Sequence, residues 1–327
     1  MIFRGVNRTR ALAVLSAAAI LAQLCASNAY SAVTGPVDGR AQRGRPSSQG
    51  RTNWQATSAN PLLYVTVPDA QLINVYRERS NLQGPIAQIS GVRSMGGIAV
   101  DADGNLLVYA GPHILEFRRG ASVPFRVLEA VSGGFGVAVD ASGTVYAGGP
   151  DNAIRIYDHG APIPTRTVRD PIMTQIHAVA VSRSGTIFCN GTEIIGSSGY
   201  FPLDELRPHA VVPTRLRYLD AYGGLGIGKD DTLVVQDSLE TTISVYARPY
   251  TGSSVTEFTY GGELALSDMA LTMGRRYVWI IGATKNRDAI FGQRFSLARG
   301  AELNQTPNIG GGYDGNNAIA VDPPALR

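Results

Sequence analysis

The sequence predicts an all-β fold, namely a six-bladed β-propeller closed by pairing of the C-terminal strand with the N-terminal blade. A strand–turn–strand unit recurs along the body of the chain, and the two ends of the repeated region supply complementary parts of one unit. No apolar pattern with the 3.6-residue period of a helix follows residue 30 over a helical length. The 327 residues are 44% hydrophobic and 17% charged, which is typical of a globular protein and not of a disordered chain.

The innermost strand of each unit is a run of small and branched apolar residues, followed by a turn that contains Asp or Gly. It is clearest at residues 97–101 (Gly-Ile-Ala-Val-Asp), 136–140 (Gly-Val-Ala-Val-Asp) and 318–322 (Ala-Ile-Ala-Val-Asp). The six copies close at Asp101, Asp140, Ser182, Gly228, Thr272 and Asp322, so successive copies lie 39, 42, 46, 44 and 50 residues apart. This is the length of one propeller blade. Small residues suit strands that converge on an axis, where bulky side chains would collide.

The outer strands of each unit have patterns of their own. Third strands alternate along their length, as at 73–76 (Ile-Asn-Val-Tyr) and 243–246 (Ile-Ser-Val-Tyr), which is typical of a pleated strand. Blade four breaks this pattern, and we expect it to have lost its alternating third strand, with residues 194–200 in its place. Fourth strands share a Pro-x-Arg signature, found at 124–126, 164–166 and 213–215. Proline suits an outer edge strand, because its missing N–H interrupts no ladder there.

The two ends of the repeated region favour a closed ring. The chain enters at residues 62–65 (Leu-Leu-Tyr-Val), which match a second strand, and it leaves at 318–322, which match a first strand. Joining them completes a sixth blade and protects the edges that an open array would expose. An all-β sandwich would explain neither the phase of the two ends nor the repeated turns.

The N-terminal region is predicted to be a signal peptide at residues 1–29, followed by a flexible linker at 30–60 and the propeller at 61–327. Three arginines precede an apolar run at 11–24, which is too short for the roughly 20 residues of a membrane span. Ser27 and Ala29 suit cleavage after Ala29. We therefore expect an exported protein, periplasmic or extracellular, with no transmembrane span.

Two further features of the sequence bear on membrane anchoring and on nucleic-acid binding. Cys25 follows the apolar run, but a bulky Leu24 stands directly before it, which disfavours lipid anchoring. The formal charge of +3 comes from the N-terminal segments, so the body after residue 60 is mildly acidic. An acidic body lacks the basic footprint of a nucleic-acid-binding protein, and we expect no nucleic-acid partner.

The repeat resembles a known family. Gly-Ile-Ala-Val-Asp, a Gly-containing turn, an apolar strand and then Ile-x-Val-Tyr are similar to NHL-type repeats. The Pro-x-Arg strand resembles the version in exported bacterial propellers of the TolB-like six-bladed group. The likeness covers about residues 62–322 and fades after the third blade. It implies the fold but no activity, because this group contains both enzymes and binding modules.

Function in propellers usually gathers at the mouth of the central channel, where the inner strands begin. The residues predicted there are Met95, Phe135, His177, Tyr222, Asp268 and Asn317. Similar propellers of the gluconolactonase type hold a divalent ion at this place, and the streptogramin lyase type uses a magnesium-binding acid and a general-base histidine. One carboxylate and one amide supply few oxygens for such a hard cation.

Two functions are left open by these residues. The first is a non-catalytic, monomeric propeller without a cofactor, which binds a partner protein or a small ligand through Phe135, His177, Tyr222, Asp268 and Asn317. The alternative is a metal-dependent hydrolase (a lactonase) or lyase. Asp268 and Asn317 would then hold Ca²⁺ or Mg²⁺, and His177 would be the candidate general base.

Overall fold

The structure of the chain is a computed structural model. It describes residues 60–78, 84–220, 222–260, 268–272, 274–283, 289–309 and 317–322. The predicted signal peptide, and the predicted linker up to residue 59, lie outside the described residues. The short segment Ile194–Tyr200, which includes strand β14 (Ser198–Tyr200), forms a unit separate from the body of the chain.

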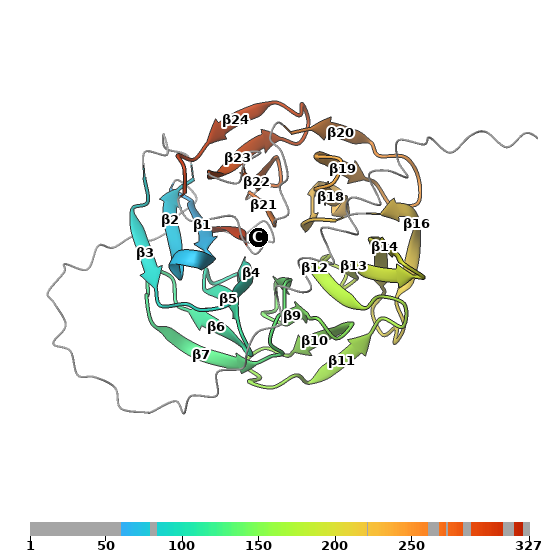
Figure 1. Ribbon diagram of the computed structural model, residues 1–327, viewed down its shortest axis with the longest axis horizontal. Helices are drawn as coiled ribbons and strands as arrows, with labels where there is room; N and C mark the ends of the chain where they lie inside the picture. Colours follow the sequence, from blue (N-terminus) through green and yellow to red (C-terminus); the bar gives the residue numbers. More distant parts are fainter. Residues whose placement is uncertain are drawn as a thin grey trace, which may run out of the picture. The chain divides into compact units, whose positions relative to one another are not determined.

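The body is an all-β, six-bladed propeller, as predicted, and each blade is one antiparallel sheet (Figure 1). From the inside outward, blade one consists of β25 (Ile319–Asp322), β1 (Leu62–Val67), β2 (Leu72–Arg77) and β3 (Ala87–Ser90). Blade two consists of β4 (Met95–Val100), β5 (Leu106–Ala110), β6 (His113–Phe117) and β7 (Pro124–Glu129). Blade three consists of β8 (Val137–Val139), β9 (Val145–Gly148), β10 (Ala153–Tyr157) and β11 (Arg166–Arg169).

The second half of the ring repeats this order. Blade four consists of β12 (Gln175–Val181), β13 (Ile187–Ile195), β15 (Pro202–Leu206) and β16 (Thr214–Asp220). Blade five consists of β17 (Leu225–Ile227), β18 (Leu233–Asp237), β19 (Thr242–Tyr246) and β20 (Thr256–Thr259). Blade six consists of β21 (Met269–Leu271), β22 (Tyr277–Ala283), β23 (Ile290–Ser296) and β24 (Glu302–Gln305).

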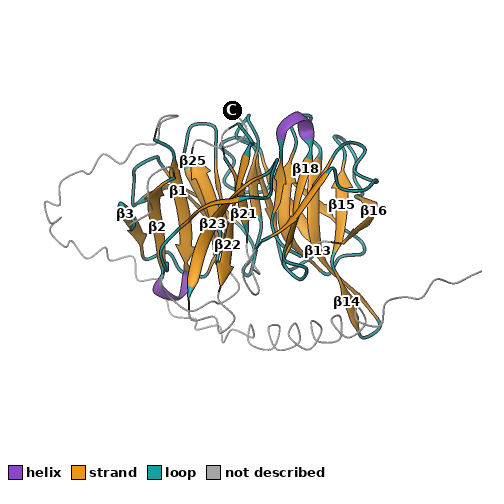
Figure 2. Cartoon of the chain, turned by 90° about the horizontal axis from the view of Figure 1, so that it is seen from above, coloured by secondary structure: helices purple, strands orange, loops and turns teal. Residues whose placement is uncertain are grey.

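Two short 3₁₀ helices mark the two faces of the body. Helix η1 (Pro68–Ala70) follows β1, and helix η2 (Lys229–Asp231) follows β17; Figure 2 shows them on opposite faces. The end of β1 pairs with the start of β25, so η1 lies on the face where the inner strands begin. In the described part of the chain, no helix has the length and apolarity needed to cross a bilayer.

The ring closes through the C-terminal strand, as the sequence predicts. Strand β1 pairs with β2 on one side and with β25 on the other, in a register that places Tyr64 opposite Ala320 and Val65 opposite Ile319. Arg119, in the turn between β6 and β7 of blade two, donates from Nε and Nη2 to the two carboxylate oxygens of Asp322, both at 2.7 Å. This bidentate pair fixes the end of β25 against the neighbouring blade.

The core of the protein lies between the blades. The described buried side chains fall into separate clusters, such as one shared by blades one and two (with Leu62 and Ile98) and one shared by blades six and one (with Trp279 and Ile319). Each sheet is therefore covered on both faces by its neighbours. The inner strands leave a narrow space at the axis because small residues predominate on them.

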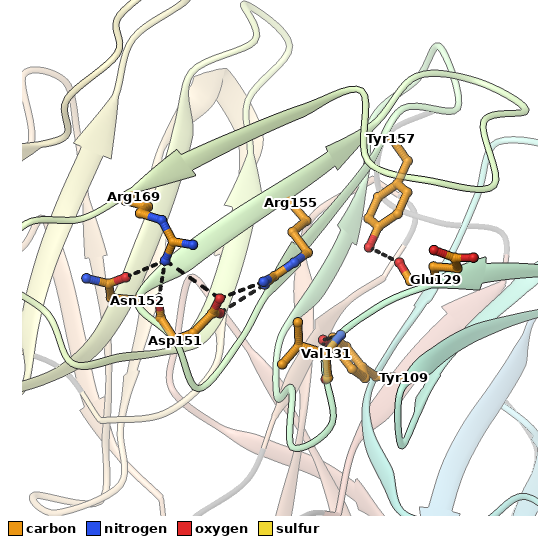
Figure 3. A network of polar contacts seen from close by, with 8 residues as sticks. All are labelled: Tyr109, Glu129, Val131, Asp151, Asn152, Arg155, Tyr157 and Arg169. Carbon is orange, nitrogen blue, oxygen red and sulfur yellow. Dashed lines mark hydrogen bonds and ion pairs between the residues drawn. The ribbon is translucent and has the colours of Figure 1, made fainter.

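The connection from blade two to blade three is held by two tyrosines (Figure 3). Tyr157 donates its hydroxyl to the carbonyl of Glu129 at 2.6 Å, and Tyr109 donates to the carbonyl of Val131 at 2.9 Å. Beside them, Arg155 pairs with Asp151 through two hydrogen bonds of 2.9 and 2.6 Å. This connection leads directly into the start of β8, so these contacts position the blade-three side of the channel mouth.

One expectation about the blades is wrong. Blade four has not lost its third strand: β15 occupies that place and pairs with β13 and β16. All five residues of β15 are buried, and its acidic residues are neutralised by arginines, since Asp204 pairs with Arg215 and Glu205 with Arg207. A strand buried on both faces shows no alternation of apolar and polar residues, which is why the pattern did not reveal it.

Candidate ligand site at the channel mouth

A cavity of about 150 Å³ runs along the axis of the propeller and is lined by all six inner strands. Its walls carry small and aliphatic side chains, for example Ala99, Ala138 and Ala270. Asp268 is the one ionisable side chain among the described residues that line it. The channel is therefore an apolar tube with a single acidic group near the face on which the inner strands begin.

An aromatic row forms one side of this mouth. Phe135 stacks on His177 with ring centres 5.2 Å apart, and His177 meets the ring of Tyr222 edge-on, also at 5.2 Å. Phe201, which directly precedes β15, extends the row, with its ring centre 4.5 Å from that of Tyr222. Phe135, His177 and Tyr222 come from three successive blades, so the structure brings together three of the residues predicted from the sequence.

Buried polar side chains hold this row in place. Asn190 on β13 accepts a hydrogen bond from the N–H of Ala178 at 2.9 Å and donates to the carbonyl of Gly223 at 2.7 Å, linking blades four and five. Thr192 lies two residues further along the same strand, with its hydroxyl 2.8 Å from Nε2 of His177. The orientations of His177 and of the Tyr222 segment are thus fixed from the second strand of blade four.

His177 is electrically neutral at physiological pH. The ring is partly buried among aromatic side chains, and this desolvation lowers the pKa of the imidazole to about 4. The ring packs between Phe135 and Tyr222, and its Nε2 is engaged with Thr192. His177 therefore adds a neutral, hydrogen-bonded ring to the aromatic row and contributes no positive charge to the mouth.

Asp268 stands at a position where the other blades have glycine or alanine. The equivalent residues include Gly136 and Gly224, and an added Cβ at these positions would approach the backbone of the next blade too closely. At Gly136 it would lie 2.8 Å from the His177 carbonyl oxygen, and at Gly224 2.5 Å from the Met269 nitrogen. The side chain at this position thus points toward the next inner strand, which for Asp268 is the start of blade one.

The carboxyl group of Asp268 has no positive partner among the described residues. Its Oδ1 accepts a hydrogen bond from the N–H of Met269 at 2.9 Å. Burial raises its pKa to about 7, and the Met269 N–H opposes this rise only in part. Near neutral pH the group is therefore divided between its protonated and its charged form.

Asn317 is buried next to the start of β25, with 2% of its surface exposed. Its Nδ2 donates to the carbonyl of Thr66 at 3.1 Å. Its Oδ1 is buried and accepts no hydrogen bond from the described residues. A buried acceptor without a donor is costly, and such groups are rare in folded proteins.

The structure places the remaining predicted mouth residue elsewhere. Met95 is 3% exposed and packs in the core between blades one and two, so it does not reach the mouth. In contrast, Phe201 and Thr192 contact the aromatic row, and the sequence pattern does not predict them there. Thr192 stands in the run 190–192 (Asn-Gly-Thr) of a second strand, where the repeat pattern gives no reason to expect a mouth residue.

Among the described residues, the mouth offers few side-chain ligands for a divalent cation. No group of three or more His, Cys, Asp or Glu side chains capable of holding a metal occurs among them. The imidazole Nε2 of His177 is already engaged with Thr192, which leaves Asp268 and Asn317 as oxygen donors. Calcium takes six to eight oxygen ligands, far more than these two residues supply.

No protein-family model and no curated protein matches this chain. The fold and the mouth provide an apolar channel, an aromatic row with a neutral imidazole and, among the described residues, one carboxyl group without a positive partner and one buried acceptor without a donor.

Proposed function

We propose that this chain is an exported, non-catalytic propeller of the NHL-repeat, TolB-like type, which binds a partner protein or a small ligand at the mouth of its channel. The observation that carries the proposal is the aromatic row of Phe135, His177, Tyr222 and Phe201 beside an apolar channel. Aromatic side chains that line a concavity, with a few polar groups among them, are typical of ligand sites.

The chemistry of His177 supports binding over catalysis. A general base works best when its pKa is near the working pH, and a pKa of about 4 makes His177 a weak base at pH 7. Its ring is also held by Thr192 and by two aromatic neighbours. These contacts suit a wall of a binding site better than a group that must exchange protons.

A thermal-shift screen of the full chain against small molecules, with parallel peptide screening, tests the proposal. Compounds or peptides that bind the unmodified chain should bind the Phe135→Ala and Tyr222→Ala variants at least about tenfold more weakly, because each substitution removes a large part of the apolar contact surface. Phe125→Ala is the matched control, since Phe125 is 43% exposed on the outer strand of blade two. Hits that bind equally to all four proteins would contradict a site at the mouth.

The metal-dependent alternative has its own test. Calorimetric titration of the full chain with Ca²⁺ and with Mg²⁺ should give no tight binding under the present proposal, because Asp268 and Asn317 offer too few oxygens. Tight binding that disappears in Asp268→Ala would instead favour a hydrolase or lyase centred on the channel.

A further inference from the structure

Two hydrogen-bond acceptor groups lie at the blade-six and blade-one side of the mouth. Asp268 has a carboxyl group without a positive partner among the described residues, and Asn317 has a buried Oδ1 without a donor. Both are hydrogen-bond acceptors, and one carries a negative charge when ionised. A positively charged hydrogen-bond donor would satisfy both the carboxyl group of Asp268 and the Oδ1 of Asn317.

These two groups lie on neighbouring inner strands. At the equivalent junction between blades three and four, a Cβ at Gly136 is directed at the carbonyl of His177, the residue just before the inner run of blade four. Asn317 is the residue just before the inner run of blade one. The repeat therefore directs the side chain of Asp268 toward the backbone of Asn317 and Ala318.

The acidic group lies on the blade next to the one that carries Tyr222. A Cβ at Gly224 would lie 3.1 Å from the carbonyl carbon of Asp268, and Gly224 is two residues from Tyr222. The mouth residues thus follow one another round the ring as an arc, from Phe135 on blade three through His177 and Tyr222 to Asp268 on blade six and Asn317 on blade one.

No described positive group competes at this arc. His177 is neutral at pH 7, and the other titratable side chain of the arc besides Asp268 is the phenol of Tyr222. Aromatic faces attract cations through their ring electrons. A charged carboxylate in an apolar channel is itself stabilised when a cation binds beside it.

Resting on the proposed binding role, we infer that the mouth selects a small organic ammonium ion, whose N–H groups bind Asp268 and Asn317 and whose apolar body lies on Phe135 and Tyr222. An organic cation fits better than a metal ion, because an ammonium group needs only a few hydrogen-bond acceptors and favours apolar surroundings for its body. The channel offers the carboxyl group of Asp268 among aliphatic side chains, and the arc adds the Asn317 acceptor and the aromatic rings.

The test compares three probes of one shape at pH 8: protonated 2-phenylethylamine, neutral 2-phenylethanol and anionic phenylacetate, each titrated calorimetrically into the full chain. The amine should bind at least about tenfold more tightly than the alcohol and the acid, since a desolvated charge pair discriminates strongly. Asp268→Asn should remove this preference while keeping the shape of the site, and Asp158→Asn, an exposed acid on blade three, should keep it.

A second measurement needs no variant. In the unmodified chain, affinity for the amine should fall as the pH is lowered from 8 to 6, because Asp268 takes up a proton in this range, whereas affinity for the alcohol should stay constant. Equal affinity for amine and alcohol, or an Asp268→Asn variant that keeps the preference, would overturn the ammonium inference. Failure of all three probes to bind would overturn it as well.

These outcomes are distinct from failure of the proposed function. If the amine is not preferred but screening hits still depend on Phe135 and Tyr222, the mouth is a binding site for another class of ligand. If the hits are insensitive to Phe135→Ala and Tyr222→Ala, the mouth is not the site and both proposals fail.

Discussion

At the scale of single residues, Asp268 is the clearest departure from the repeat. Other blades have glycine or alanine at this position, where the backbone of the next blade is close. A carboxyl group in that position loses water and gains one backbone hydrogen bond, so its pKa rises to about 7. Such an unfavourable group at a channel mouth is a common sign of a functional site.

This residue gives the first prediction. The pKa of Asp268 is higher in the folded chain than in the unfolded chain, so its contribution to stability is greatest at low pH and declines as the pH rises toward 7. Asp268→Asn removes the decline. As the pH rises from 5 to 8, the free energy of unfolding of the variant should therefore increase by about 2 kcal/mol relative to that of the unmodified chain.

Urea unfolding at the two pH values measures this difference. The comparison with the variant is needed because Asp204, buried beside Asp170, also has a pKa raised to about 7 and adds its own pH dependence. A stability difference that is the same at pH 5 and pH 8 would show that Asp268 is solvated like an ordinary surface carboxyl group.

His177 gives the second prediction. Burial between Phe135 and Tyr222 keeps its imidazole neutral, so its Cε1 proton resonance should stay constant from pH 8 to pH 5 and move only below that, with a midpoint near 4. The resonance can be assigned from its loss in His177→Gln, since the chain has four histidines. A midpoint between 6 and 7 would mean that the ring is hydrated and available as a base.

The sequence identified part of this site. Phe135, His177 and Tyr222 were predicted because the inner strands are recognisable and these residues precede them. Met95 was assigned to the mouth by the same rule, but Gly96 and Gly97 with a shift of register in β4 carry Met95 into the core. Phe201 was missed because it precedes a third strand, and its position at Tyr222 depends on how blade four folds.

At the scale of elements, β25 is held by pairing with β1 and by one ion pair. Asp322 is completely buried, and both its oxygens accept hydrogen bonds from Arg119, whose side chain is 25% exposed. Removing the arginine leaves a buried carboxylate without its cation, which costs more than the ion pair itself contributes.

The third prediction follows from this pair. Arg119→Met should lower the free energy of unfolding by about 3 kcal/mol, as measured by urea denaturation at pH 7. The matched control is Arg169→Met, because Arg169 is 60% exposed and Asp151 keeps its bond to Arg155. The control should change stability by less than about 0.5 kcal/mol. Equal effects of the two substitutions would mean that the end of β25 does not depend on Arg119.

The elements also show where sequence patterns fail. Strands with one polar face, such as residues 73–76 and 243–246, were predicted correctly because their alternation is visible. Strand β15 was missed because Asp204 and Glu205 are buried in it, and the arginines that neutralise them come from outside the strand. The pairing of Asp204 with Arg215, on the next strand, is not visible in the local sequence pattern.

At the scale of the whole molecule, the closed ring was predictable from the phase of its two ends. Residues 62–65 have no inner strand of their own, and residues 318–322 have no second strand, so each supplies what the other lacks. Spacing and small residues determine this architecture, whereas the NHL and TolB-like assignment and the export of the protein stay predictions. The occupant of the mouth depends on side-chain geometry that the repeat does not encode.

The most direct test of a ligand site at the mouth is methyl NMR of the full chain labelled on its five methionines. Met269 lines the channel beside Asp268, whereas Met173 lies in the core shared by blades three and four. Titration with 2-phenylethylamine at pH 8 should shift the Met269 methyl resonance until it saturates, at the affinity found by calorimetry, and leave Met173 unchanged. A Met269 resonance that does not move while the amine binds would contradict the account.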